Sequence, residues 1–520
     1  MSDNPDMKTT AGKIENLGNL LAQAAAPMGE DVAAATREAG RLTARDRVLR
    51  LVDEGSFVET DALARHRSKD FGREHDRPAT DGVVTGYGTI SGQKVCVFSQ
   101  DVTVFDGTVG EVYGDKLTKL YDLALKTGVP VVGIYESAGP RVQEGIVTLA
   151  MYSRIMARMT AASGLIPQVA VVVGDNEGMA AFPPVLADVV VISQDGALHQ
   201  ATPKVVEQVF GDADATVDKL GDAAVHATES GTAHLVADSD AHAIDVAREV
   251  LEYFPANNRA EAARTAVAPM AGSIADNISD ADRALDSIIP DEDQAAYDMA
   301  DVIRGVVDEG SFYELSAEYA PNLITGFARV EGRVVGVVAN QPMVQAGALD
   351  TRAAEKGARF IRTCDAFNTP IVEFVDSPGF IPSPEEERAG LLRRGAKLAY
   401  AFAEASVGTL TVITRKAIGP AYVMMGSKDL GADLVYAWPT ADIAVAQASV
   451  AAEAIYGEPT DEQVSDYADK HMGPYLAAER GLADAVIEPS ATRGHLIEGL
   501  RLLERKITPA NVKKHGNLPL

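Results

Sequence analysis

Two short turns, each following a buried apolar run, carry the chemistry open to this sequence. Ala138–Gly139 follows the run Val129–Tyr135, and Pro420–Ala421 follows the run Leu410–Thr414. Each turn leads into a helical pattern, and the first N–H groups of a helix have no internal acceptor and lie at the positive end of its dipole. Such amides can stabilise an oxyanion, each donor contributing about 2.7–4 kcal/mol to transition-state stabilisation. An ordinary tight strand–helix connection has the same spacing, so the pattern alone favours neither interpretation.

Side chains offer little catalytic chemistry in this sequence. The nine histidines are scattered along the chain, and no HExxH, GxSxG or phosphate-loop motif occurs. Glu136 and Asp376 occupy matching positions at strand ends, where acids more commonly bond their local turns than act as bases. We therefore expect no metal site and no side-chain triad.

The elements that position these turns occur twice. Leu51–Phe57 reads LVDEGSF and returns as VVDEGSF at Val306–Phe312. Further along, a constant shift of 240 residues carries glycine and proline positions of the first copy onto the second, as Gly139 onto Gly379. A period this long indicates two copies of a whole domain, because solenoid repeats run about 20–50 residues.

Within each copy, continuous apolar runs alternate with glycine turns and amphipathic helical patterns, as in Lys116–Lys126 followed by Val129–Tyr135. Such runs are typical of strands buried on both faces, and strand–turn–helix repetition predicts an α/β fold with parallel strands. We place the two domains at residues 1–265 and 285–520. A linker rich in alanine, aspartate and serine is expected at about 260–285.

Composition excludes several classes of partner. The 520 residues carry a formal net charge of −28, with 75 acidic against 47 basic side chains. Nucleic acids and anionic membranes require basic surfaces, so we expect neither as a partner. The two cysteines, Cys96 and Cys364, make no disulfide framework, and the sequence shows no secretory signal and no apolar run near the about 18 residues of a membrane span. We therefore expect a cytoplasmic protein.

Five segments show an ordered pattern that extends over both copies. They are Arg141–Gly145 and Ser163–Gln168 in the first copy, and Asn340–Pro342, Gly395–Ala405 and Tyr436–Thr440 in the second. With their surroundings they resemble the carboxyltransferase β chain of biotin-dependent acyl-CoA carboxylases, of the propionyl-CoA/acetyl-CoA type. The resemblance covers nearly the whole chain, so the chain is identified as a member of this family.

The resemblance implies a tandem of crotonase/ClpP-like domains, with acyl-CoA bound on the first and biotin on the second. It implies hexamers in which each active site lies between the first domain of one subunit and the second domain of another. Biotin is then carried by a separate chain, the biotin carboxylase/biotin carboxyl carrier subunit, and no metal is needed. The implied reaction moves CO₂ from carboxybiotin to the α-carbon of an acyl-CoA. One oxyanion hole serves the thioester enolate and another the biotin ureido oxygen, and biotin itself can take the α-proton.

The first copy departs from the family pattern at two loops. Where the family usually has Ser-Gly-Gly-Ala-Arg, this chain has Ser-Ala-Gly-Pro-Arg, and the amides of Ala138 and Gly139 carry over as the catalytic donors. The family's Ala-Gly-Gly-Ala loop reads Glu-Gly-Met-Ala here. Gly178 and Met179 of that loop are expected substrate contacts, with an added acid and a bulky side chain near the acyl-CoA.

The second copy departs at the turn assigned to biotin. The family's Tyr-Gly-Gly-Ala-Tyr reads Ile-Gly-Pro-Ala-Tyr here, and Pro420 has no N–H, which leaves Ala421 as the remaining donor. Tyr422 and Val423 follow as expected substrate contacts. A residue tied to the choice of acyl chain commonly stands at the latter position, and an apolar valine there suggests an acyl group other than propionyl.

Three arginines, Arg45, Arg47 and Arg141, could contact the CoA phosphates, although ion pairing with nearby acids explains them equally simply. Three functions follow from the resemblance and its departures. The chain is a working carboxyltransferase with an altered pocket, a catalytically weakened paralogue that completes a mixed hexamer, or a subunit of a biotin-dependent acyl-CoA decarboxylase. A homo-hexamer and a mixed hexamer both stay open.

Overall fold

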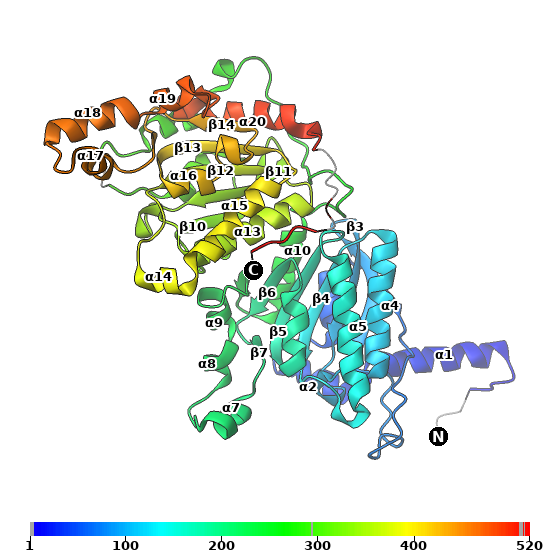
Figure 1. Ribbon diagram of the computed structural model, residues 1–520. Coiled ribbons are helices and arrows are strands. Elements are labelled where there is room, and N and C mark those ends of the chain that lie inside the picture. The colour runs from blue at the N-terminus through cyan, green and yellow to red at the C-terminus, as the bar shows by residue number, and fades with distance from the viewer. Residues whose placement is uncertain (1–4, 293–294, 509–512, 514, 520) are drawn as a thin grey trace. The chain divides into compact units, whose positions relative to one another are not determined.

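The computed structural model describes residues 5–292, 295–508, 513 and 515–519. It divides into two compact units, Met1–Asn258 and Arg259–Leu520, each built on one sheet with helices packed on it (Figure 1). The α/β fold with a duplicated domain that the sequence predicts is confirmed.

The sheet of the first unit joins an antiparallel hairpin to a parallel core. Within the described residues its order is β1-β2-β3-β4-β5-β6-β8, with β7 paired to β5, and every pairing from β3 onward is parallel. All residues of β4 are buried, as the continuous apolar run predicts. The strands are β1 (Val58–Thr60), β2 (Val83–Ile90), β3 (Gln93–Gln100), β4 (Val131–Ser137), β5 (Gln168–Glu177), β6 (Val189–Ser193), β7 (Ala197–His199) and β8 (Leu235–Ala237).

Helices α4 and α5 pack against each other and against this sheet, and their buried side chains form one core with β3–β6. The helices of the first unit are α1 (Thr10–Ala25), α2 (Glu30–Glu38), α3 (Ala44–Leu51), α4 (Glu111–Thr127), α5 (Ile146–Ala162), α6 (Phe182–Val185), α7 (Pro203–Phe210), α8 (Val217–Gly221), α9 (Ala223–Thr228) and α10 (Asp240–Leu251).

The second unit repeats this plan. Among the described residues its sheet has the order β16-β14-β13-β12-β11-β10-β9, with β15 paired to β13 just as β7 pairs with β5. The strands are β9 (Tyr313–Leu315), β10 (Leu323–Val330), β11 (Arg333–Asn340), β12 (Ile371–Ser377), β13 (Thr409–Ile418), β14 (Leu434–Ala437), β15 (Asp442–Ala444) and β16 (Ala485–Val486). The helices are α11 (Asp280–Arg283), α12 (Met299–Val306), α13 (Thr351–Ala366), α14 (Pro384–Ala389), α15 (Leu391–Glu404), α16 (Pro420–Met424), α17 (Ala448–Tyr456), α18 (Asp461–His471), α19 (Pro474–Glu479) and α20 (Thr492–Leu502).

The segment 259–285 belongs to the second unit, although the sequence predicts a linker over most of it. The N–H of Thr265 donates to the carbonyl of Gly332 at 2.9 Å, and the N–H of Val334 donates to the carbonyl of Ala263 at 2.9 Å. The segment therefore pairs with the β10–β11 hairpin. Its alanine- and aspartate-rich composition gives no sign of these backbone bonds, and the boundary lies at 258/259.

The LVDEGSF repeat builds a clasp in the first unit. The carboxylate of Asp53 accepts hydrogen bonds from the N–H groups of Ser91 at 3.0 Å and Gly92 at 2.9 Å, and from Arg248 at 3.1 Å. These contacts, the Gly92 amide first, lower the pKa of Asp53 to about 2. One carboxylate thus ties the end of α3 to the β2–β3 hairpin and to α10.

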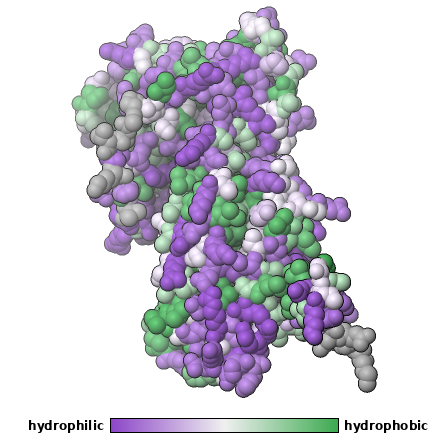
Figure 2. All heavy atoms as spheres, turned by 90° about the vertical axis from the view of Figure 1, so that its right-hand side faces the viewer, coloured by the Kyte–Doolittle hydropathy of each residue, from purple (hydrophilic) through white to green (hydrophobic). Residues whose placement is uncertain are grey.

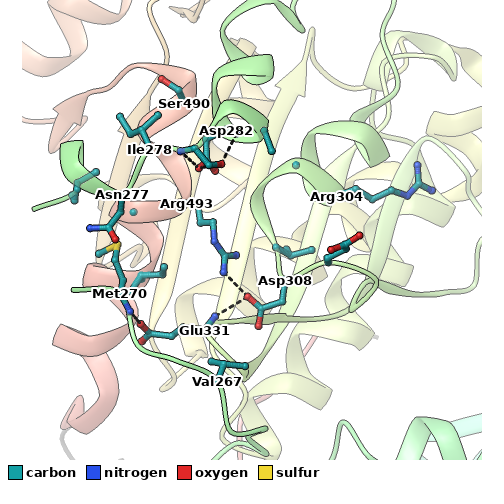
Figure 3. Close-up of a pocket in the computed structure, with 18 of the residues that line it drawn as sticks. Val267, Met270, Asn277, Ile278, Asp282, Arg304, Asp308, Glu331, Ser490 and Arg493 are labelled. Atoms are coloured by element: carbon teal, nitrogen blue, oxygen red, sulfur yellow. Dashed lines mark hydrogen bonds and ion pairs between the residues drawn. The ribbon is translucent and has the colours of Figure 1, made fainter. Parts of the chain in front are cut away.

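The second unit has the same clasp. Asp308 accepts from the N–H groups of Glu331 at 3.0 Å and Gly332 at 2.7 Å, and from Arg493 at 2.6 Å (Figure 3). Here the carboxylate ties the end of α12 to the β10–β11 hairpin and to α20. The duplicated motif is therefore a device for holding the fold, which explains its repetition without any catalytic role.

Buried lysines repeat as well, at positions 240 residues apart. The Lys116 ammonium donates to the carbonyl of Val83 at 2.5 Å. The Lys356 ammonium donates to the carbonyls of Ser316 and Tyr319, both at 2.8 Å, and of Ala320 at 3.4 Å. Each lysine satisfies loop or strand carbonyls that burial removes from water.

Hydrophilic side chains cover much of the face seen in Figure 2, with apolar ones between them in smaller groups. This agrees with the charged composition.

In the ranges that the structure describes, no helix combines the length and apolar character needed to cross a membrane.

Replacing Lys356 with methionine should destabilise the second unit. The loop carbonyls that the ammonium serves are left without a donor, and each unsatisfied buried group costs about 1–3 kcal/mol, so we expect a total loss of about 3 kcal/mol or more. Urea unfolding followed by circular dichroism measures this loss. K470M removes a lysine that is 62% exposed and pairs with Asp466 on the same helix, and it should change stability by less than about 0.5 kcal/mol. Equal effects of the two substitutions would contradict the assigned role.

Candidate oxyanion-stabilising turns

The turn after β4, predicted to hold the catalytic amides, has both of them engaged. The N–H of Ala138 donates to the carbonyl of Asp106 at 3.1 Å, and the N–H of Gly139 donates to the Ser137 hydroxyl at 3.2 Å. The Gly139 carbonyl in turn accepts from the N–H of Val109 at 2.9 Å. A thioester oxygen could use these amides only by displacing their present acceptors.

Internal symmetry pairs each turn of the first unit with one turn of the second. The counterpart of Gly139 is Gly379, whose carbonyl accepts from Leu349 at 3.0 Å and whose N–H donates to the Ser377 hydroxyl at 3.4 Å. Both turns follow the equivalent strands β4 and β12. The turn at Pro420, in contrast, follows β13, the equivalent of β5. Its partner in the first unit is therefore the turn at Met179 and not the turn after β4.

The turn after β5 has a free donor. Gly178 adopts φ +60°, a left-handed conformation that suits glycine, and a short 3-10 helix, Gly178–Ala181, begins there. Among the described residues the N–H of Met179 has no hydrogen-bond acceptor. The Met179 side chain is half-buried against the core of the first unit. This amide is the first unit's candidate for stabilising negative charge.

The turn after β13 is built in the same way. Gly419 has φ +55°, and its own N–H donates to the carbonyl of Ala444 at 2.8 Å. Pro420, exposed at the start of α16, has no N–H, as predicted. Within the part of the chain that the structure covers, no acceptor meets the N–H of Ala421, which lies in a buried residue. A buried N–H without an acceptor is costly, so this position favours a ligand that supplies one.

The two residues after this amide differ in exposure. Val423 is 44% exposed and presents an apolar surface beside the turn. The Tyr422 hydroxyl is buried and has no partner among the described residues, and burial raises the pKa of this phenol. Tyr422 therefore supports the turn from inside.

The matched acids at the strand ends are paired with arginines. Glu136 accepts a hydrogen bond from Arg41 at 2.7 Å and forms an ion pair with Arg47 at 2.8 Å. Asp376 accepts from Arg415 at 3.0 Å, and its other oxygen accepts from the N–H of Lys416 at 3.1 Å. Both carboxylates hold local structure, so neither is placed as a general base.

The three predicted phosphate contacts lie in different environments. Arg141 is 1% exposed and donates to Asp81 at 2.5 Å, to Glu144 at 3.0 Å and to the carbonyl of Thr108 at 2.8 Å. A phosphate could reach this guanidinium only by displacing those acceptors, so the structure gives Arg141 an internal role. The ion pairing that the sequence offered as an alternative is the arrangement found.

Arg47 is almost as buried as Arg141, at 3% exposure, and belongs to the Glu136 pair. It lines, with Arg41, a cavity of about 510 Å³ in the first unit. Burial raises the pKa of Asp101 on the same wall. Arg45 pairs with Glu59 at 2.5 Å, and its side chain is 23% exposed. Arg45 and Arg47 are therefore near or at surfaces that a polar ligand can reach.

A larger cavity, of about 880 Å³, lies in the second unit (Figure 3). None of the predicted site residues lines it. Asp282, Asp308 and Glu331 on its wall already accept hydrogen bonds from neighbouring backbone or side-chain donors. The cavity follows from the packing of α11, α12 and α20, and we assign it no chemistry.

The Met179 N–H of the first unit and the Ala421 N–H of the second can therefore each stabilise an oxyanion. In the described residues there is no group of three or more histidine, cysteine, aspartate or glutamate side chains that could hold a metal ion. The sequence contained the signal for Met179, because a shift of 241 residues carries Gly178 onto Gly419. What it could not show is that the Ala138 amide finds an acceptor 32 residues earlier in the chain.

Comparison with known proteins matches residues 35–518 to the carboxyl transferase domain family. The beta5 subunit of the biotin-dependent acetyl-/propionyl-coenzyme A carboxylase of Mycobacterium tuberculosis is 48% identical over 99% of this chain and 96% of its own length. The methylmalonyl-CoA decarboxylase subunit alpha of Veillonella parvula is 44% identical over 99% of this chain and 100% of its own length.

A solved structure is similar over the same extent. The crystal structure of transcarboxylase 12S, a hexamer with methylmalonyl-coenzyme A and methylmalonic acid bound, has a TM-score of 0.94 and 40% sequence identity. The match covers 98% of this chain and 99% of that chain. The fold of each unit and its duplication are thus those of a known two-domain enzyme.

Replacing Arg141 with methionine should destabilise the first unit strongly. Asp81 is fully buried, and losing its partner leaves an uncompensated carboxylate, which costs about 3–5 kcal/mol. R45M, which removes a partly exposed arginine, should cost less than about 1 kcal/mol. Urea unfolding of the two variants measures the difference. An R141M protein as stable as the parent would show that this guanidinium is available for a ligand.

Proposed function

Because the chain belongs to the carboxyl transferase family, as a carboxyltransferase subunit of the acyl-CoA carboxylase type, we propose that it transfers CO₂ from carboxybiotin on a partner chain to the α-carbon of an acyl-CoA. One observation carries the proposal. Equivalent turns of the two units each offer a backbone N–H that meets no acceptor within the described residues, at Met179 and at Ala421. Two separate donors suit a reaction in which two oxygens, on two substrates, gain negative charge.

In the first unit, the Met179 N–H stabilises the thioester oxygen as the α-carbon loses its proton. The negative charge of the enolate then rests mainly on that oxygen. The amide is held in place by β5 and by the left-handed Gly178, so it needs no reorganisation when the charge develops. A fixed donor of this kind lowers the barrier by about 2.7–4 kcal/mol.

In the second unit, the turn offers the Ala421 N–H to biotin. When bound, carboxybiotin supplies the CO₂ that is transferred. The Ala421 N–H donates to the ureido oxygen, and Pro420 and Val423 beside it give an exposed apolar border. We assign no proton transfer to a side chain, because Glu136 and Asp376 are ion-paired. Biotin that has given up its CO₂ would take the α-proton.

The finer details of binding and assembly belong to the same proposal. Arg45 and Arg47 contact the CoA phosphates, the latter from the wall of the 510 Å³ cavity. The biotin carboxylase/biotin carboxyl carrier subunit is a separate chain. The chain works in the cytoplasm as a homo-hexamer or in a mixed hexamer with a paralogous β chain, and the hexameric assembly of transcarboxylase 12S supports six subunits.

The experiment combines the purified chain with the biotin carboxylase/carrier subunit encoded in the same genome. Labelled bicarbonate, ATP and acetyl-, propionyl- or longer acyl-CoA are added, and acid-stable label in the acyl-CoA product is measured. We expect carboxylation of at least one of these thioesters. Absence of product with every thioester, under conditions in which another β chain works with the same carrier, would refute the proposal.

Replacing Met179 with proline should remove the donor while keeping the turn, because Pro420 already occupies the equivalent position. We expect kcat for acyl-CoA carboxylation to fall by about 10²–10³-fold, the usual effect of losing one oxyanion donor. M179A keeps the N–H and shortens the side chain, so its kcat should stay within about tenfold of the parent. Equal losses in the two variants would assign the effect to the side chain.

A second candidate is a catalytically weakened paralogue in a mixed hexamer, and Pro420 is the observation that favours it. If the missing donor limits the rate, P420G should raise kcat by about 100-fold. P378G, at the proline of the turn after β12, serves as the control and should leave kcat unchanged. An unchanged P420G enzyme would show that the single Ala421 donor suffices, which supports the working enzyme.

A third candidate, a decarboxylase subunit, rests on the similarity to the Veillonella parvula protein. The same two donors would serve the reverse direction, in which a carboxylated acyl-CoA gives up its CO₂. Genes for a biotin carboxylase next to this one would favour carboxylation, and genes for a membrane pump would favour decarboxylation.

A further inference from the structure

His199 lies next to the turn that presents the Met179 amide. It ends β7, where its register partner on β5 is Glu177, the residue before Gly178. The imidazole is 2% exposed. Its Nε2 lies 2.7 Å from the Asp175 carboxylate, and its Nδ1 lies 3.0 Å from the carbonyl of Ala201.

Both ring nitrogens therefore face acceptors. A neutral imidazole has one N–H and would leave one of these contacts as two facing lone pairs, whereas the imidazolium donates to both. The hydrogen bond to Asp175 raises the pKa of His199, with smaller contributions from the Ala201 carbonyl and the charge of Glu177, and burial opposes the shift. The cation is thus the form that this pocket accommodates.

The other elements packed on β7 direct their titratable groups elsewhere. On α9, His226 contacts the carbonyl of Leu198 at 2.7 Å. On α8, the Lys219 ammonium donates to the carbonyl of Asp214 at 2.8 Å, and Asp218 is exposed. The 3-10 helix at Gly178–Ala181 has no titratable side chain. Asp175 and Glu177 are the charged partners that act on the imidazole.

The second unit has no such arrangement. Ala444, on β15, is the register partner of Ile418 on β13. This is the position that His199, on β7, occupies opposite Glu177 on β5. The turn at Ala421 is therefore held without a histidine at this position. Any dependence on this imidazole is specific to the first unit.

We propose that His199 is a positioning residue whose imidazolium, held between Asp175 and the Ala201 carbonyl, fixes the end of β5 and thereby aims the Met179 N–H. The part of this inference that concerns the amide rests on the proposed function. The imidazolium ties β5 to the segment after β7 across the strand pair. Without it, Asp175, which is 52% exposed, loses its anchor and the last residues of β5 gain freedom.

The sign of the pH dependence follows from the raised pKa. The stabilising contribution of the imidazolium is complete below the ordinary histidine pKa of about 6.5 and is lost as the pH rises through the raised value. We therefore expect the turn to loosen, and the carboxylation rate to fall, on the alkaline side of that value.

Hydrogen exchange by mass spectrometry tests the structural half of this inference without any acyl-CoA. Peptides covering 175–182 are followed from about pH 6 to about pH 9, with the intrinsic exchange rate divided out. We expect protection in the parent to fall about tenfold across this range, in step with loss of the charge. H199Q should have low protection throughout. D175N, which keeps the imidazole, should move the transition to lower pH, since one charged partner is lost.

His242, on α10, provides the matched control, because it also stands beside an aspartate, Asp238 at 3.6 Å, but its side chain is 48% exposed. H242Q should follow the parent at every pH. The inference is overturned if protection of 175–182 in the parent does not change with pH, or if H199Q keeps the parent's transition.

Kinetic measurements test the second half of the inference, that His199 positions the Met179 N–H. H199Q should lower kcat about tenfold with little change in KM, and should flatten the alkaline limb of kcat, whereas D175N should shift that limb toward lower pH. The inference is also overturned if the exchange result is as predicted but the alkaline limb of kcat is unaltered. His199 would then fix the strand end without aiming the amide. If the parent carboxylates no acyl-CoA, the proposed function fails, while the exchange result still decides whether His199 holds the turn.

Discussion

In each unit, a central strand leads into a turn with a backbone N–H that has no acceptor among the described residues. The rest of the unit is arranged around this constraint. Proteins satisfy nearly all buried amides, so a vacant donor is costly and persists only where the surroundings hold it. Here β5 and β13, central in their sheets, run straight into a left-handed glycine and a short helix. Among the described residues, no acceptor meets the N–H of Met179 or of Ala421.

Much of the remaining polar structure serves to make that geometry rigid. The aspartate clasps hold helix ends to hairpins in both units, and the buried lysines close the loops beside them. Arginines neutralise the acids at the ends of β4 and β12. These contacts remove candidate bases and leave an apolar, charge-compensated frame. A backbone dipole held in this way can act on a developing charge without reorganising.

The fold can be predicted from the sequence because the relevant signals are local. Continuous apolar runs such as Val129–Tyr135 can be satisfied only by burial on both faces, and the LVDEGSF repeat reveals the duplication directly. The missing donor at Pro420 was also readable, since it follows from the covalent structure of proline. Local patterns and residue chemistry therefore predicted the architecture and the missing N–H at Pro420.

The rest depended on contacts between distant residues. Ala138 looked like a free donor until the carbonyl of Asp106 proved to accept from it, and Arg141 looked available until Asp81 proved to be its buried partner. The segment 259–285 likewise joins the second unit through backbone bonds that leave no mark on its composition. Hydrogen bonds across long loops are set by the closure of the fold, and a single sequence does not display them.

The most direct test is a crystal structure of the chain with a non-enolisable acyl-CoA analogue bound. The account predicts that the thioester-type oxygen lies about 2.7–3.1 Å from the backbone nitrogen of Met179, with the Ala138 N–H still bonded to Asp106. An oxygen held instead by Ala138 and Gly139, or an analogue seated on the second unit, would contradict it.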